Sequence, residues 1–127
     1  MIRILYIGLG GFLGSVARYL VAKYINNYFS NFPLGTLFVN VTGSFLLGFI
    51  VYSFLTGKNI SPEFRDFSTI GFIGAYTTMS TFAYESFRLM ELSETMFFVF
   101  NVVLNVALCL LAVNFGKELA VLLTNKG

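Results

Sequence analysis

Charged side chains are scarce in this sequence. Only 11% of its 127 residues are Asp, Glu, Lys or Arg, whereas 57% are hydrophobic and 18% are aromatic. So few charges cannot cover a surface that faces water, which excludes an ordinary soluble domain. The composition therefore predicts an integral membrane protein, folded as one domain over residues 1–127.

Histidine is absent, and the chain has a single cysteine, Cys109. Without histidine it lacks the commonest general base and metal ligand, which argues against an enzyme. One cysteine cannot form a disulfide within the chain, and we interpret Cys109 as a small core residue. The net charge of +2 comes without a basic run, so the sequence predicts no binding to nucleic acid.

Four stretches of the sequence carry no charge: 4–17, 24–57, 67–84 and 95–116. With flanking positions, each supplies the roughly 20 apolar residues that a helix needs to cross a bilayer. We therefore predict an all-α membrane protein with four transmembrane helices, at residues 2–24, 35–55, 66–91 and 95–122.

Two helix starts are marked by their residues. Ser61, Pro62 and Glu63 combine an N-cap hydroxyl, a proline at the first helical position and an acid in the first turn. By the same logic, Ser93 followed by Glu94 is expected to cap the fourth helix.

Basic residues give only a weak signal for orientation in the membrane. With four crossings, both termini and the 56–66 loop share one side, which holds five basic residues against three on the other. This imbalance predicts insertion in both orientations. Four helices are few to enclose a polar pathway, so we expect an antiparallel, dual-topology homodimer. The two groups are Arg3, Lys58, Arg65, Lys117 and Lys126, against Arg18, Lys23 and Arg88.

The stretch "GLGGFLGS" places small residues four apart in the first helix, with Gly10 and Gly14 on one face and Gly11 and Ser15 on another. Such faces allow close helix packing. The letters also look like a nucleotide-binding fingerprint, but no strand precedes them and no acid follows about 20 residues later, so we reject that interpretation.

Polar residues recur at helical spacing in the second and fourth helices. Thr36, Asn40 and Ser44 are each four apart, as are Asn101 and Asn105, so each set lies on one face. An amide inside a membrane is costly without a partner. Asn40 is therefore either a hydrogen-bonding link between helices or part of a polar pathway.

Charge inside the predicted bundle is limited to Arg18 and Glu85. Arg18 either extends to the membrane interface or stands in a water-filled vestibule that attracts anions. Cation and proton carriers usually place an acid in their pathway, whereas the polar stripes here are neutral. Hydroxyl and amide donors, helped by the positive edges of aromatic rings, instead suit a small hydrated anion.

The third helix contains the stretch "GAYTTMSTF", residues 74–82, in which five of nine side chains are hydroxyls. These hydroxyls either bond back to the preceding helical turn or line a pathway. A family resemblance is carried by "GGFLGSVARY", "GTLFVNVTGSFLLG" and "GFIGAYTTMSTF" with the following Glu85. In these stretches the chain resembles the Fluc fluoride channels, also called the CrcB family.

The resemblance implies an antiparallel homodimer with two fluoride pores that lets toxic cytoplasmic fluoride leave across the cell membrane. It also implies a third helix broken at "GAYTT", where the carbonyls of Gly74 and Thr77 bind a structural sodium ion at the dimer centre. We expect Arg18, Glu85, Ser44 and Asn101 to form a vestibule or to support the pore. The expected pore residues are Thr36, Asn40, Met79, Ser80, Thr81, Phe82 and Asn105, with Met79 where the family usually has a second phenylalanine.

Two other functions fit part of the pattern. Small multidrug-type exporters share the length, the four helices and often the dual topology, but they use a glutamate in the first helix, where this chain has no acid. A non-conducting assembly subunit would use its polar stripes only to pair helices, and a flux assay in liposomes separates it from both transport functions.

Overall fold

The computed structural model describes residues 1–127, and every regular element in it is helical, as expected. Three helices are long and apolar enough to cross a membrane: α1, α2 and α6. Between α2 and α6 the chain follows one interrupted helical path. The elements are α1 Ile2–Tyr28, α2 Leu34–Leu55, α3 Pro62–Asp66, π-helical η1 Phe67–Ile73, α4 Gly74–Tyr76, α5 Met79–Glu91 and α6 Thr95–Asn125.

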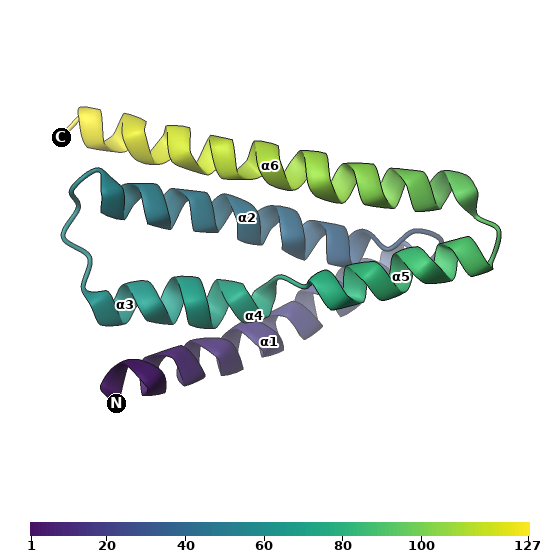
Figure 1. Cartoon of the computed structure of the whole chain (residues 1–127), viewed down its shortest axis with the longest axis horizontal. Helices are drawn as coiled ribbons and strands as arrows, with labels where there is room; N and C mark the ends of the chain where they lie inside the picture. Colours follow the sequence, from purple (N-terminus) through teal and green to yellow (C-terminus); the bar gives the residue numbers. More distant parts are fainter.

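The helical segments lie lengthwise beside one another (Figure 1). The two termini and the connection between α2 and α3 lie at one end of the molecule. α1 and the path from α3 to α5 run away from that end, whereas α2 and α6 run back side by side. Compared with the predicted ranges, α1 and α6 extend further, to Tyr28 and Asn125.

One predicted helix start is confirmed and the other is wrong. The Ser61 hydroxyl accepts a hydrogen bond from the Phe64 N–H at 3.2 Å and so caps α3. Ser93, in contrast, has a left-handed φ of 58° and does not cap α6, whose N-cap is Glu94 without a side-chain bond. The reason is that Ser93 closes α5: its N–H bonds to Met90 O, and the Glu94 N–H reaches Leu89 O, which is a Schellman end.

The small residues of α1 bring two backbones together, as predicted for Gly10 and Gly14. A Cβ on Gly10 would collide with the Phe67 carbonyl, and one on Gly14 with the Phe72 carbonyl. Close packing of α1 against η1 therefore requires glycine at both positions. A second such contact, between Gly48 of α2 and the α6 backbone, has no counterpart in the sequence predictions.

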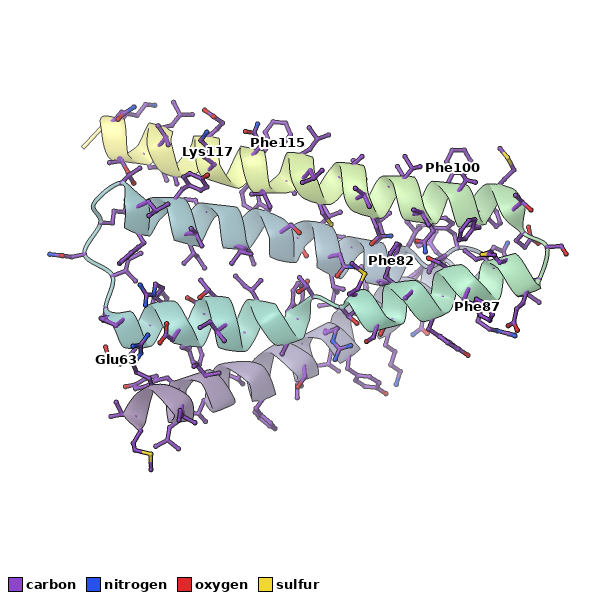
Figure 2. All side chains as sticks on the ribbon, viewed as in Figure 1. Glu63, Phe82, Phe87, Phe100, Phe115 and Lys117 are labelled. Carbon is purple, nitrogen blue, oxygen red and sulfur yellow. The ribbon has the colours of Figure 1, made fainter.

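The interior is small and holds as many polar or charged side chains as apolar ones. Only 21 of 127 residues are buried, and they include Asp66, Asn101 and Asn105. Large apolar side chains such as Phe100 and Phe115 project from α6 away from the other helices (Figure 2). In water this arrangement would be unstable, whereas in lipid it leaves the apolar side chains solvated and gives the polar ones partners.

Candidate functional site

The helical path from Pro62 to Glu91 breaks at Thr77 and Thr78. Both residues have extended backbones, with φ and ψ of −84° and 157° at Thr77 and of −150° and 119° at Thr78. The Thr78 hydroxyl then accepts a hydrogen bond from the Thr81 N–H at 3.2 Å and starts α5. The predicted interruption at "GAYTT" is thus present, and Thr78 is its N-cap, a role the sequence prediction did not assign.

The break removes helical hydrogen bonds from nearby carbonyls. In a continuous helix the Thr78 N–H would bond to Gly74 O and the Thr81 N–H to Thr77 O. Here the Thr78 N–H donates to Oδ1 of Asn40 at 2.8 Å, and the Thr81 N–H bonds to the Thr78 hydroxyl. The carbonyls of Gly74 and Thr77 therefore lose their helical partners and can accept other ones.

Arg18 lies beside this break. Its Nε donates to the carbonyl of Ala75 at 3.0 Å, so one freed carbonyl already has a cationic partner. The side chain also lines a cavity together with Lys23. Of the two interpretations of Arg18, this position favours the vestibule, because the guanidinium is held at the break rather than at a helix end.

Two cavities lie next to the break and share one lining residue. The first has a volume of about 400 Å³, the second about 370 Å³, and Thr78 lines both. The first is lined by Ser15, Arg18, Tyr19, Ala22, Lys23, Asn26, Thr36, Val39, Thr78, Thr81 and Glu85. The second is lined by Asn40, Thr77, Thr78, Met79, Phe82, Asn105, Val106, Cys109 and Leu110.

Thr36 and Glu85 are paired in the first cavity. The Thr36 hydroxyl donates to Oε1 of Glu85 at 2.6 Å, and Oε2 of Glu85 is buried without a partner. The hydroxyl hydrogen of Thr36 is therefore bonded to the carboxylate and is not free for another acceptor. Sequence spacing placed Thr36 on the same face as Asn40 but gave no sign of this contact with a residue 49 positions away.

Asparagine side chains form a buried network that links three helices. Nδ2 of Asn40 donates to Oδ1 of Asn105 at 3.1 Å, and Nδ2 of Asn105 donates to Oδ1 of Asn101 at 3.0 Å. Asn101 is 0% exposed, lines neither cavity, and donates to the Ser86 hydroxyl at 2.9 Å. The prediction that Asn101 and Asn105 share one face is confirmed, and Asn40 is their partner on α2.

The first turn of α5 divides its side chains between the two cavities. Met79 and Phe82 line the second, as expected for residues one turn apart, and Phe82 points from α5 toward α2 and α6 (Figure 2). Thr81 lines the first cavity. Met79 is 74% exposed, and Ser80 is exposed and lines neither cavity. One face of this turn is therefore uncovered within a single chain.

The remaining hydroxyls behave differently from one another. Thr77 bonds back to Ile73 O at 3.0 Å, which is the local alternative considered for this stretch. Thr81 instead accepts from the Thr78 hydroxyl at 3.1 Å and keeps its own hydrogen for another acceptor. Ser44 is half-buried and lines neither cavity, so the stripe on α2 reaches the site only at Thr36 and Asn40.

Comparison with known proteins gives one consistent result. The family model described as CrcB-like protein, Camphor Resistance (CrcB), matches residues 5–117. The protein named fluoride-specific ion channel FluC 1 of Methanosarcina acetivorans is 50% identical over 117 residues, or 92% of this chain and 89% of that protein. Fluoride-specific ion channel FluC of Campylobacter jejuni is 41% identical over 114 residues, or 89% of this chain and 93% of that protein.

Proposed function

Because the chain belongs to the CrcB-like family, we infer that it is a fluoride-selective ion channel in the cell membrane. The similarity to proteins named fluoride-specific ion channels extends over most of both chains. The chain is a multi-pass membrane protein. A channel of this kind passes its ion passively and catalyses no reaction, and it would let toxic fluoride leave the cytoplasm.

The observation that carries this function is the pair of cavities that share the lining residue Thr78. The first is lined by Arg18 and Lys23, whose positive charge attracts an anion, and by Glu85, whose carboxylate accepts a bond from Thr36. The second holds the ring of Phe82, whose edge is electropositive. Thr81 offers a hydroxyl hydrogen in the first cavity, so a small anion can exchange its water for protein donors in steps.

The segment Pro62–Glu91 supplies the fourth membrane crossing in this proposal. Its pieces are each too short to span a bilayer, but together they run the length of the bundle, with η1 and α4 beside α1 and α5 beside α6 (Figure 1). An interrupted helix is tolerated at membrane depth only where its freed backbone groups find partners. Asn40 and Arg18 provide two such partners.

The functional unit in this proposal is an antiparallel homodimer with two pores. Support comes from the uncovered face of α5, where Met79 is 74% exposed although it lines the second cavity. Gly74, at the start of the break, is exposed as well. A second chain in the opposite orientation would cover these positions and close each pore along its length.

A sodium ion fits the carbonyls of the break. Those of Gly74 and Thr77 have lost their helical partners, and carbonyl oxygens freed by an unwound membrane helix are typical sodium ligands. Two chains would offer four such oxygens at the dimer axis. The ion would supply positive charge that fixes the two broken helices to each other, as a structural part that is not transported.

The test of the function is fluoride efflux from liposomes that contain the purified protein. We expect rapid fluoride release and little or no chloride release, because the pathway has ring edges and hydroxyls suited to a small anion. Protein-free liposomes from the same lipid give the background leak. Equal release of both anions, or fluoride release at the background rate, would reject the proposed function.

A further inference from the structure

The side-chain amide of Asn40 bonds to both backbone polar groups of Thr78, the N–H and the C=O. Oδ1 accepts from the Thr78 N–H at 2.8 Å, and Nδ2 donates to the Thr78 carbonyl at 3.2 Å. Thr78 is the N-cap of α5, so its carbonyl also accepts the first bond of that helix, whereas its N–H has no helical partner. In apolar surroundings an unpaired peptide group costs several kcal/mol, and the Asn40 amide removes this cost at the point where the helix breaks.

No hydrogen of this amide is left for an anion. A primary amide has two N–H hydrogens, and the second one of Asn40 goes to Oδ1 of Asn105 at 3.1 Å. The reverse orientation of the amide would set its N–H groups against the Thr78 N–H, which has no lone pair to accept them. Asn40 therefore lines the second cavity with its hydrogen-bonding groups already committed.

The orientation of Asn40 is passed along the network. The carboxamide oxygen of Asn105 faces Asn40 because its nitrogen donates to Asn101, to the backbone oxygen at 2.8 Å and to Oδ1 at 3.0 Å. The nitrogen of Asn101 is in turn fixed by the Ser86 hydroxyl at 2.9 Å. Each amide donates to the next oxygen in one direction, so rotation of any member breaks the bonds of its neighbour.

We propose that Asn40, Asn105 and Asn101 are positioning residues that hold the helix break at Thr78, and that Asn40 acts on the pathway through this peptide rather than as a ligand of the anion. That the asparagines hold the helix break does not depend on which ion the protein conducts. That they affect fluoride flux rests on the proposed function.

The experiment measures amide hydrogen exchange at Thr78 in the purified, full-length protein, for Asn105→Ala and for Cys109→Ala. Both residues lie on α6 one turn apart and line the second cavity, but Cys109 makes no hydrogen bond in the network. Asn105→Ala leaves one of the two hydrogens on Nδ2 of Asn40 without its acceptor and so orients the amide less firmly, and exchange at Thr78 should rise about tenfold. Cys109→Ala should leave it within about twofold.

Asn105→Leu is a second variant for the case in which Asn105→Ala does not fold. Leucine largely fills the space of the asparagine side chain but offers no hydrogen-bond acceptor. Faster exchange at Thr78 in the Asn105 variants alone supports the proposal. Unchanged exchange there in a folded Asn105 variant overturns it, and so does an equal rise in Cys109→Ala, which would mean that any loss from the cavity wall loosens the break.

Fluoride efflux from the same preparations separates the two conclusions. With a conducting parent, the Asn105 variants should lose about tenfold in fluoride flux in parallel with the rise in exchange, and normal flux despite fast exchange would overturn the role in the pathway. If the parent itself passes no fluoride, the proposed function fails, while the exchange at Thr78 still decides whether the asparagines hold the break.

Discussion

Among single side chains, Met79 and Phe82 form a pair on one face of α5, both lining the second cavity. An aromatic edge is electropositive, whereas a thioether is polarisable but has no fixed positive rim. An anion at this point therefore depends mainly on Phe82. We expect Phe82→Ala to lower fluoride efflux by about tenfold, or roughly 1.4 kcal/mol in the barrier.

Met79→Phe makes the converse change. It restores two ring edges at roughly similar volume, so flux should equal or exceed that of the parent, with chloride still excluded. Met79→Ala should instead admit water and weaken the exclusion of chloride. All variants are first checked by size exclusion and then compared in the same liposome assay. Normal flux in Phe82→Ala together with unaltered behaviour of both Met79 variants would mean that neither side chain lines the pathway.

Side-chain spacing along one helix was enough to predict which residues share a face, but not which partners they meet. The pair Asn101 and Asn105 lies on one face as predicted, whereas Thr36 and Asn40, predicted on one stripe, line different cavities. The bond from Thr36 to Glu85 joins residues on different helices, so no local pattern contains it. For the same reason, sequence alone could not show that the Asn40 amide is already fully bonded.

Among the elements, the contact of α1 with η1 is set by glycine. A Cβ at Gly14 would overlap the backbone of Phe72, whereas one at Gly8, on the same helix, would have nothing within 4 Å. Alanine favours a helix over glycine by about 1 kcal/mol at either position. We therefore expect Gly14→Ala to lower thermal stability, because overpacking costs about 1–3 kcal/mol, and Gly8→Ala to keep or raise it.

The two thermal stabilities are compared by heating aliquots of each purified variant. The monodisperse peak that remains is then measured by size exclusion. The matched pair removes the effect of helix propensity, since both variants exchange the same residue types in α1. A Gly14→Ala protein as stable as Gly8→Ala would show that α1 can move away from η1 at no cost, and that the tight packing is not required.

Long apolar elements were predictable from the sequence because lipid imposes their length. The residues at which these helices begin and end were less predictable. Ser61 caps α3 as its residues predicted, whereas Ser93 serves the end of α5 instead of the start of α6. Ser61 is followed by Pro62, which favours the first position of a helix, whereas Ser93 has only the acid after it, a weaker signal for a helix start. Likewise, the close contact at Gly48 depends on α6, which lies far away in sequence.

At the scale of the whole molecule, a single chain leaves the site half covered. Its buried residues include several polar side chains, many large apolar ones are exposed, and one face of α5 at Met79 has no cover from its own chain. Lipid would cover an apolar face, but the exposed Ser80 and Gly74 lie on the same stretch. This mixed face supports the proposed homodimer, in which a second copy of the chain would cover it.

An antiparallel dimer requires that chains insert in both orientations, and the charges support this. Five basic residues are assigned to the end with the termini and three to the other end, which is a weak bias, so neither orientation is strongly favoured. We expect a C-terminal tag on the parent chain to be found on both sides of the membrane in comparable amounts, as measured by side-specific labelling of intact cells and of lysed cells.

Adding basic residues after Gly127 should place the C-terminus of every chain on the cytoplasmic side, because lysine and arginine near a membrane end determine orientation. Such a chain lacks an oppositely oriented partner, so fluoride export from cells should fall to background. Co-expression with a chain that carries extra lysines in the connection between α1 and α2 should restore it, since the two biased chains insert in opposite directions. Full export by the first biased chain alone, with all tags on one side, would rule out the antiparallel dimer, because parallel copies cannot bring the two uncovered faces of α5 together across a two-fold axis in the membrane plane.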